Sequence, residues 1–232
     1  MLVFFDIDDT LVDHYRAFRL ATTELHRRVD SQIAKETFLS HWADVHRQYF
    51  GRYLAGELSY QEQSRARIRA AVDPRLRDEQ ADRLFAVYLD AYEAVWSLFP
   101  DVEACLGSLA QHRLGVISNG QRSQQVKKLE RTGIIDKFDC ILISEECGHS
   151  KPGAEIFRHA CALAGEPAER AIYVGDRYDV DAVGARQAGL AGVWLDRRGN
   201  ASAEHKPPIV GSLCELPWTV DSIERMLRNP AG

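Results

Sequence analysis

The stretch Leu2-Val3-Phe4-Phe5-Asp6-Ile7-Asp8-Asp9-Thr10 runs from four apolar residues directly into a group of acids. The apolar run predicts a strand buried on both faces, as in the parallel sheet of an α/β protein. If the strand geometry continues to residue 8, its two-residue period puts Asp6 and Asp8 on the same side. Two carboxylates at the tip of a buried strand repel each other unless a cation or a shared proton relieves them. The stretch therefore indicates a functional site. The alternative is a polar strand end at which Asp9 or Thr10 caps the next segment.

The composition is that of a soluble globular protein. The 232 residues, 45% apolar and 27% charged, suffice for one domain with an insertion or for two small domains. A net charge of -5 argues against a nucleic acid polymer as partner. The five cysteines form no Cys-x-x-Cys pair, which is typical of reduced thiols in the cytosol. Acids interrupt the N-terminal apolar stretch, and no run approaches the ~20 apolar residues of a spanning helix. We therefore expect a cytoplasmic chain without a signal peptide or a membrane partner.

Helix-forming residues dominate positions 14–98. Helical spacing of apolar residues predicts four helices there, at about 14–29, 32–50, 59–72 and 76–97. Gly51, Gly56 and Asp73-Pro74 are the expected breaks. An all-helical insert after the first strand predicts a separate helical bundle at 14–98, with a second domain made of 1–13 and 99–232.

Short β-type runs alternate with helical stretches from residue 100 onward. The expected strands are 114–118, 140–143, 171–175 and 192–195, and the expected helices are 101–111, 122–132, 153–164, 179–188 and a terminal one near 219–228. Residues 198–212 are expected to form a surface loop. This order predicts an α/β fold with a parallel, doubly wound sheet, in which ligands bind beyond the carboxyl ends of the strands.

Polar residues stand at those strand ends. Asp6 ends the first strand, Ser118-Asn119-Gly120 follows the second, and Gly175-Asp176 follows the run Ile172-Tyr173-Val174. Lys151-Pro152 stands just before a predicted helix. Each segment alone is typical of a turn, an exposed lysine or a helix cap. Their common place in the predicted fold indicates one shared site.

With these residues together, the chain resembles the haloacid dehalogenase superfamily of phosphohydrolases that carry a helical cap of the first type. Asp6, Asp8 and Thr10 match the family's Asp-x-Asp-x-Thr motif, and Ser118 matches its hydroxyl residue at a strand end. Lys151 matches the family lysine. The motif Gly-Asp-x-x-x-x-Asp is matched by Gly175, Asp176 and Asp181. The resemblance covers nearly the whole chain.

The resemblance implies a Mg²⁺ ion held by Asp6, Asp176 and the backbone carbonyl of Asp8. Asp6 is implied as the nucleophile that forms an aspartyl phosphate, and Lys151 as the group that balances the negative charge around it. Asp181 is implied to orient Lys151 or a metal-bound water. The implied phosphate-binding groups are Thr10, Ser118, Lys151 and the backbone N–H of Asn119.

Asp8 distinguishes between reaction classes within this resemblance. As an acid it protonates the leaving alcohol, and as a base it takes a proton from the attacking water. We expect its acidic neighbours Asp6 and Asp9 to favour the protonated form that the first step needs. The family's dehalogenating members lack an acid at this position, so Asp8 favours a phosphatase.

The helical insert is implied to be a cap that contacts the leaving group. Tyr15, Arg16 and Arg19 follow the expected entry hinge, and Arg67 is the residue we expect to face the substrate. Aromatic residues and arginines around Tyr49–Arg67 resemble, loosely, the cap of the family's nucleotidases. The alternative is that the aromatic residues pack the bundle and the arginines are solvated.

The expected function is a magnesium-dependent phosphatase acting on a small phosphorylated metabolite, a nucleoside monophosphate or a sugar phosphate. The chain is expected to be a monomer or a homodimer. A phosphomutase on the same scaffold, a phospho-accepting signalling module and a non-catalytic binding protein are the alternatives. A receiver module is about half this length and lacks a large helical insert, which makes it a poorer match.

Overall fold

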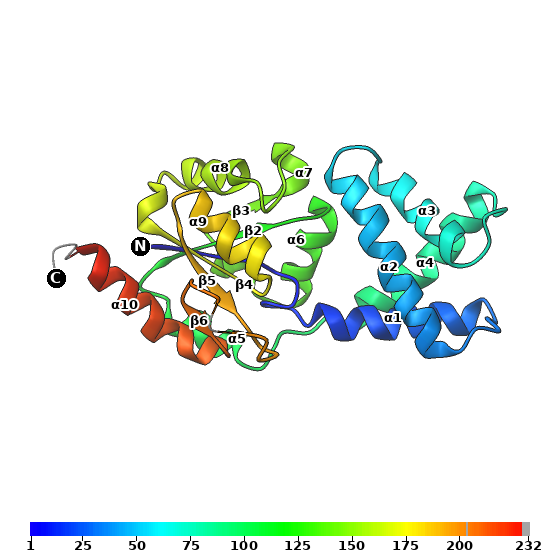
Figure 1. Cartoon of the computed structure of the whole chain (residues 1–232), viewed down its shortest axis with the longest axis horizontal. Helices are drawn as coiled ribbons and strands as arrows, with labels where there is room; N and C mark the ends of the chain where they lie inside the picture. Colours follow the sequence, from blue (N-terminus) through cyan, green and yellow to red (C-terminus); the bar gives the residue numbers. More distant parts are fainter. Residues whose placement is uncertain (203, 229–232) are drawn as a thin grey trace. The chain divides into compact units, whose positions relative to one another are not determined.

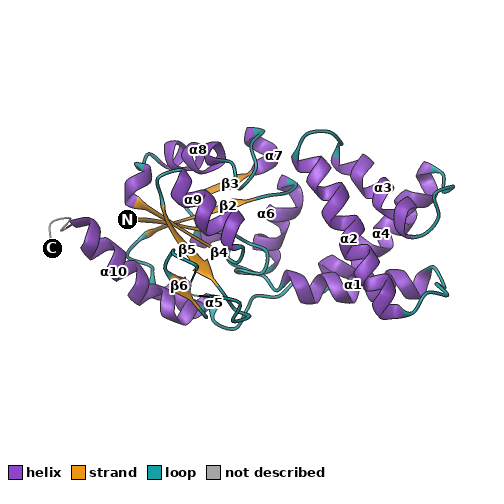
Figure 2. Cartoon of the chain, in the orientation of Figure 1, coloured by secondary structure: helices purple, strands orange, loops and turns teal. Residues whose placement is uncertain are grey.

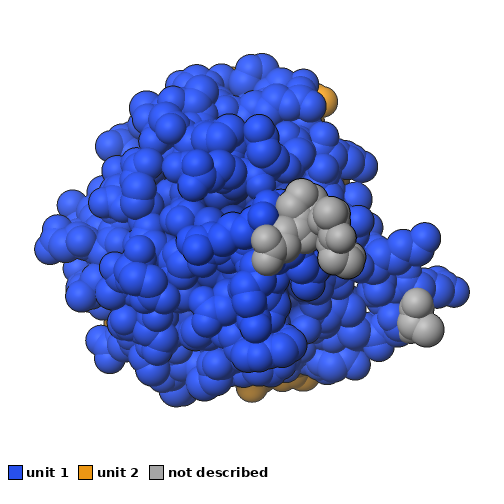
Figure 3. Space-filling model, turned by 90° about the vertical axis from the view of Figure 1, so that its left-hand side faces the viewer, with its two compact units in different colours: residues 1–13, 97–232 blue, residues 14–96 orange. Residues whose placement is uncertain are grey.

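The computed structural model describes residues 1–202 and 204–228. The chain divides into two compact units, one made of residues 1–13 and 97–232 and the other of residues 14–96, which Figure 3 draws in different colours. The return boundary lies two residues before the 98/99 boundary expected from the sequence. Within the described residues, no helix combines the length and the apolar character needed to cross a membrane.

A parallel sheet forms the centre of the first unit (Figures 1 and 2). Its strands are β1 (Leu2–Phe5), β2 (Arg113–Ser118), β3 (Cys140–Ile143), β4 (Ala171–Gly175), β5 (Ala191–Leu195) and β6 (Ile209–Val210). Their spatial order is β3-β2-β1-β4-β5-β6, and every pair is parallel. All four residues of β1 are fully buried, as their unbroken apolar run predicts. The predicted α/β fold with a doubly wound sheet is confirmed.

Helices cover both faces of this sheet (Figure 2). They are α5 (Val102–Ser108), α6 (Arg122–Arg131), α7 (Ser144–Cys147), α8 (Ala154–Ala164), α9 (Gly184–Gln187) and α10 (Leu216–Arg228). Three short 3₁₀ turns occupy Ile135–Lys137, Ala168–Arg170 and Leu213–Glu215, and a π-helical turn, Tyr178–Val183, precedes α9. Ile156 and Phe157 of α8 and Ala185 of α9 pack against buried residues of the inner strands. The central strand β1 therefore ends between β2 and β4, at the switch point of the strand order, where sheets of this kind bind ligands.

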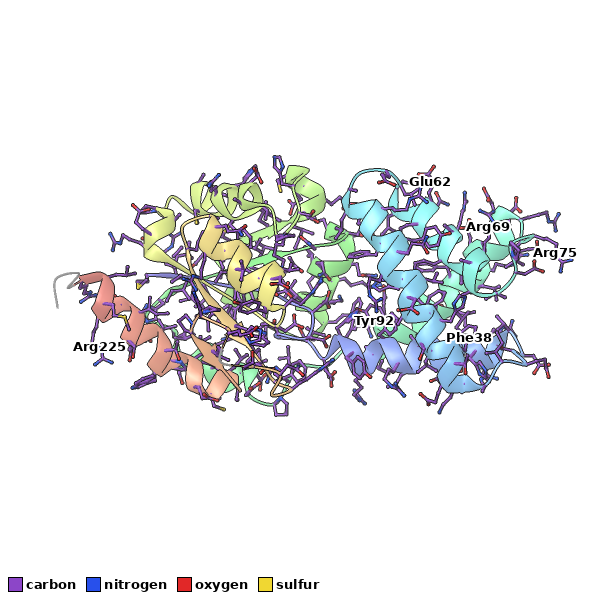
Figure 4. The ribbon with its side chains drawn as sticks, viewed as in Figure 1. Phe38, Glu62, Arg69, Arg75, Tyr92 and Arg225 are labelled. Atoms are coloured by element: carbon purple, nitrogen blue, oxygen red, sulfur yellow. The ribbon has the colours of Figure 1, made fainter. Side chains whose placement is uncertain are left out.

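The second unit contains four helices, α1 (His14–Arg28), α2 (Lys35–Leu54), α3 (Tyr60–Ala71) and α4 (Asp78–Ala94). Ser59 and Glu62, the latter labelled in Figure 4, form a capping box that starts α3. Ser59 Oγ accepts from the Glu62 N–H, and Glu62 accepts from the Ser59 N–H. The unit has its own core, in which large aromatic residues predominate: Phe18, Phe38, Trp42, Phe85, Tyr88 and Tyr92.

Two local expectations were wrong. Gly51 does not break a helix, because α2 continues through it to Leu54. An exposed glycine inside a helix costs only about 1 kcal/mol, which the packing of a long helix outweighs. Residues 198–212 are not entirely loop, because Ile209 and Val210 form β6 beside β5. A strand of two residues is too short to show the alternation that predicts one.

The loop after β1 is tied to the rest of its unit. Arg197, which follows β5, donates to both carboxylate oxygens of Asp101, at 2.8 and 2.9 Å. Its Nη2 also donates to the backbone oxygen of Thr10, at 3.0 Å. Asp101 further accepts from Ser212 Oγ and from the N–H of Leu213. One ion pair thus joins the loop of the Asp-x-Asp-x-Thr motif to the segments before α5 and α10.

Candidate active site

Three acidic side chains meet at the carboxyl ends of β1 and β4. Asp6 follows β1, Asp176 follows β4, and Asp181 belongs to the π-helical turn. One carboxylate oxygen of each lies within 4.8 Å of the others. Asp6 and Asp181 are buried, and Asp176 is half-buried. Since β1 and β4 are neighbours in the sheet, the topology alone brings these distant positions together.

Lys151 joins two of these acids. Its Nζ lies 2.8 Å from Asp6 Oδ1 and 2.7 Å from Asp181 Oδ1, and it donates to Tyr173 Oη at 2.6 Å. The side chain is buried, and burial by itself would lower the pKa of Lys151. The attraction of Asp181 and Asp6 outweighs that effect and raises its pKa. The acids therefore favour the charged form of Lys151.

The acids themselves are unfavourably placed when ionised. Burial raises the pKa of Asp6 to about 6, although Lys151 opposes this, and repulsion from Asp181 adds to it. Burial raises the pKa of Asp176 to about 9, with further repulsion from Asp181 and Asp6. Three carboxylates face one ammonium group, so full ionisation leaves an excess of negative charge. Carboxylate oxygens are the ligands that Mg²⁺ prefers, and the donor set fits such an ion.

Asp8 faces α6. Its Oδ1 lies 2.5 Å from Lys128 Nζ, and its Oδ2 accepts from Gln125 Nε2 at 3.0 Å. Both α6 side chains are buried, with 1% of Lys128 and 2% of Gln125 exposed. The sequence indicated only acids near Asp8. The structure adds a buried cation, whose charge favours the ionised form of the carboxyl group over the protonated form expected from the sequence.

Apart from Lys151, the expected phosphate-binding residues lie in the loop after β1 and at the end of β2. Ser118 is buried, and its Oγ accepts from Gln125 Nε2 at 2.7 Å. Thr10 is fully buried, and its Oγ1 has no hydrogen-bond partner among the described residues. The Asn119 side chain holds the backbone of Lys151, since Nδ2 donates to the Lys151 carbonyl at 2.9 Å and Oδ1 accepts from its N–H at 2.8 Å. Asn119 thus positions Lys151, a contact that the sequence did not indicate.

Gly175 makes room for Asp181. A Cβ at position 175 would overlap the Cγ and Oδ2 atoms of the Asp181 carboxyl group. The N–H of Arg177 donates to Asp181 Oδ2 at 2.9 Å and holds this oxygen in place. The glycine of the Gly-Asp motif is therefore required by the close approach of a side chain.

Three residues of this site were missed from the sequence: Gln125, Lys128 and Tyr173. The Tyr173 hydroxyl lies within β4, accepts from Lys151 and donates to the carbonyl of Ile117 at 2.9 Å. A tyrosine inside a buried strand needs a hydrogen-bond partner, and this was the available signal. Gln125 and Lys128 stand three positions apart on α6, where one turn brings them to the same face. Polar residues on the buried face of a short helix were the signal for them.

Arg67 lies inside the helical unit. Only 4% of it is exposed, and its guanidinium carbon lies 4.6 Å from the ring centre of Trp42 and 5.3 Å from that of Tyr88. Its Nε and Nη2 atoms have no hydrogen-bond partner among the described residues. Contacts with aromatic rings of its own unit surround this residue, and its expected contact with substrate stays a prediction. Tyr15, by contrast, is exposed, and the Arg19 guanidinium lies over its ring.

The sheet, the acids and the lysine agree with a family match that covers most of the chain. Residues 1–189 match the model of the haloacid dehalogenase-like hydrolases. The chain belongs to this family. The resemblance seen in the sequence is therefore confirmed, and the protein is a hydrolase.

Relatives with assigned activities cover almost the whole chain. The pyrimidine 5'-nucleotidase YjjG of Escherichia coli is 30% identical over 226 residues, which are 97% of this chain and 95% of that protein. The ribulose-1,5-bisphosphate 5-phosphatase of Halopiger xanaduensis is 30% identical, with 95% of each chain covered. The N-acylneuraminate-9-phosphatase of Rattus norvegicus is 28% identical over 96% of this chain and 94% of that protein.

Solved structures share the fold of the chain. The HAD-hydrolase YfnB of Bacillus subtilis, described as bound to magnesium, superimposes with a TM-score of 0.77 over 95% of this chain and 98% of that chain, at 22% identity. A 2-haloacid dehalogenase from Pseudomonas syringae is 28% identical, with a TM-score of 0.72 and the same coverage of both chains.

Proposed function

We propose that the protein is a magnesium-dependent phosphatase that hydrolyses small phosphomonoesters through an aspartyl phosphate on Asp6. The observation that carries the proposal is the meeting of Asp6 with Lys151 and Asp176 at the carboxyl ends of neighbouring strands. Phosphoryl transfer needs an in-line nucleophile and positive charge around the phosphoryl group. In this proposal residues 1–13 and 97–232 carry the catalytic groups, and the helical unit is the cap domain.

In the first step, a carboxylate oxygen of Asp6 forms a bond to phosphorus while the bond from phosphorus to the alcohol oxygen breaks. Asp8 gives its proton to the departing alcohol. Lys151 holds Asp6 through Oδ1 and carries positive charge at the attacking group. Ser118 and the N–H of Asn119 bind phosphoryl oxygens, and Thr10 helps to hold them.

In the second step, water attacks the phosphorus of the aspartyl phosphate, and Asp8 takes a proton from it. The bond between phosphorus and Asp6 breaks, which releases inorganic phosphate and restores both acids. A bound Mg²⁺, held by Asp6, Asp176 and the carbonyl of Asp8, supplies the charge that offsets the repulsion between carboxylate and phosphate. Asp181 accepts from Lys151 Nζ and helps to keep it in place.

The substrate class is a nucleoside monophosphate or a sugar phosphate. The named activities of the relatives support this choice, since they include a pyrimidine 5'-nucleotidase and a ribulose-1,5-bisphosphate 5-phosphatase. The likeness to a 2-haloacid dehalogenase makes dehalogenation the competing activity. Asp8 argues against it, because dehalogenating members of the family lack an acid at this position. A phosphomutase would return the phosphoryl group to the sugar instead of to water.

The test is phosphate release from a panel of nucleoside monophosphates and sugar phosphates, with Mg²⁺ and with a chelator. We expect release that depends on Mg²⁺ from a few members of the panel. Isomer formation without phosphate would favour the mutase, and halide release from a 2-haloacid would favour the dehalogenase. The variant Asp6→Asn, checked for folding by circular dichroism, should lose turnover. Full activity in this variant would falsify the aspartyl-phosphate mechanism.

A further inference from the structure

A buried ammonium group lies beside the side chain of Asp8. Lys128 is 1% exposed, and its Nζ is 2.5 Å from Asp8 Oδ1. Moving an ammonium group out of water costs free energy that an apolar side chain of similar length would not cost. If residue 128 served only to pack α6 against the sheet, an apolar side chain would be more stable there than lysine. The contact between Lys128 and Asp8 therefore indicates a function for the lysine.

Gln125 holds the other oxygen of the same carboxylate. Its Nε2 donates to Asp8 Oδ2 at 3.0 Å and also lies 3.3 Å from the carbonyl oxygen of Asn119. Because a backbone carbonyl can only accept, the amide nitrogen must face it, which settles the orientation of the Gln125 amide. The same nitrogen donates to Ser118 Oγ at 2.7 Å, so the Ser118 hydroxyl proton points elsewhere and remains available for an acceptor.

The two contacts hold Asp8 through both of its carboxylate oxygens. A carboxylate held at both oxygens loses its freedom to rotate. Proton transfer depends on a donor placed within hydrogen-bond reach of the leaving oxygen, and this fixed geometry is what a general acid needs.

We propose that Gln125 and Lys128 are positioning residues for the reaction. Lys128 holds Asp8 in place for both proton transfers, although its charge by itself favours the ionised form that takes the proton from the attacking water. Gln125 holds Asp8 as well and orients the hydroxyl of Ser118 toward a phosphoryl oxygen. The inference rests on the proposed phosphatase function, and it assigns the buried face of α6 to catalysis.

Substrates with different leaving groups distinguish a role of Lys128 in proton transfer from a merely structural role. An alkyl alcohol leaves only with a proton, whereas p-nitrophenolate leaves without one. The value of kcat/KM reports the steps up to departure of the leaving group. In Lys128→Met, we expect kcat/KM to fall at least tenfold for the best alkyl phosphate of the substrate panel and less than about threefold for p-nitrophenyl phosphate. Lys128→Arg should recover part of the loss for the alkyl substrate.

The controls use an exposed lysine and the acid itself. Lys137→Met changes an exposed lysine in the turn that follows the same helix and should leave both values unchanged. Asp8→Asn should reproduce the leaving-group pattern of Lys128→Met. If Lys128 acts through Asp8, adding Lys128→Met to Asp8→Asn should cause little further loss.

The variant Gln125→Ala gives a second measurement if Lys128→Met does not fold. It should lower kcat/KM for the alkyl substrate more than for the aryl one. Equal losses for both leaving groups, or full additivity of Lys128→Met with Asp8→Asn, would overturn the inference. Lack of phosphatase activity in the unchanged protein toward every substrate would overturn the proposed function instead.

Discussion

Asp6 Oδ1 and Lys151 Nζ form a 2.8 Å ion pair across 145 positions of the sequence. The acid stands at the tip of the central strand, and the lysine stands just before α8. Asp181 accepts from the same nitrogen, and the Asn119 side chain binds the backbone on both sides of the lysine's Cα. Lys151 therefore links β1, β2 and the turn after β4, so that it affects stability as well as chemistry.

Lys151→Met should reduce both activity and stability. Without the ammonium group, Asp6 and Asp181 face each other without compensation in a buried site, and losing one partner of a buried ion pair typically costs about 3–5 kcal/mol. We expect the free energy of unfolding without Mg²⁺ to fall by about 3 kcal/mol and phosphatase turnover to fall at least 100-fold. Urea unfolding and phosphate release measure the two effects. An unchanged urea midpoint would show that Lys151 does not stabilise the acids.

Gly175→Ala should disable the site through Asp181. The added methyl group overlaps the Asp181 carboxyl group, which must then move away from Lys151 and from the N–H of Arg177. We expect at least a tenfold loss of kcat and a destabilisation of about 1–3 kcal/mol, measured by steady-state kinetics and thermal unfolding. Gly107→Ala on α5 is the matched control, because a Cβ there meets no atom within 4 Å and alanine favours a helix. Equal behaviour of the two variants would contradict the role given to Gly175.

The strand ends were predictable because backbone periodicity and chain order determine them. The run Leu2–Phe5 before Asp6 has no polar residue, so we expect it to be a buried strand. Asp6 is the next residue and therefore lies at the end of that strand. The neighbourhood of β1 and β4 follows from the doubly wound topology, which makes the meeting of Asp6 with Asp176 foreseeable.

Contacts that depend on side-chain reach were not predictable. The distance from Lys128 to Asp8 depends on how α6 rotates against the sheet, and ten residues of helix do not determine that rotation. Asn119 was expected to act through its backbone N–H. The side-chain bonds to the Lys151 backbone result from a loop geometry that the residue types do not encode. The return boundary at 97 and the strand Ile209–Val210 depend on pairing with distant segments.

Asp101 should make the free energy of unfolding depend on pH in the acidic range. Its four hydrogen bonds with Arg197, Ser212 and Leu213 outweigh its burial and lower its pKa from 3.8 to about 2. A carboxyl group with a lowered pKa in the folded state stabilises that state above pH 3.8. The stabilisation is lost as the pH falls through about 2. We expect Asp101→Asn to lower the free energy of unfolding at pH 7 by about 2 kcal/mol, and by less at pH 3.

The control for Asp101 is an exposed acid. Asp44 pairs with Arg47 on the surface of α2, where both side chains are more than two-thirds exposed. Asp44→Asn should change the free energy of unfolding by less than about 0.5 kcal/mol at either pH. Urea titrations at pH 7 and pH 3 give the comparison. A loss for Asp101→Asn that is the same at both pH values would contradict a contribution from its ionisation.

Mg²⁺ should bind more tightly as the pH rises. Without metal, the pKa of Asp176 is about 9 and that of Asp6 about 6, so Asp176 carries a proton at neutral pH. A metal ligand has to be deprotonated, so binding releases this proton. Because the pKa of Asp176 is higher in the folded state, this residue contributes stability below pH 3.8, its ordinary pKa. The contribution is lost as the pH rises to about 9. Chelated protein should therefore be less stable at pH 9 than at pH 6.

Calorimetry in two buffers with different ionisation enthalpies measures the released proton, and thermal unfolding measures the gain in stability from Mg²⁺. We expect proton release near pH 7 and a larger increase in Tm with Mg²⁺ at pH 9 than at pH 6, because the metal removes the repulsion that ionised Asp176 feels from Asp6 and Asp181. Asp176→Asn has no proton to release and should bind Mg²⁺ weakly at both pH values. It should also abolish the decline of stability between pH 6 and pH 9 in chelated protein. Tight, pH-independent binding by this variant would show that other groups of the site, and not Asp176, bind the metal.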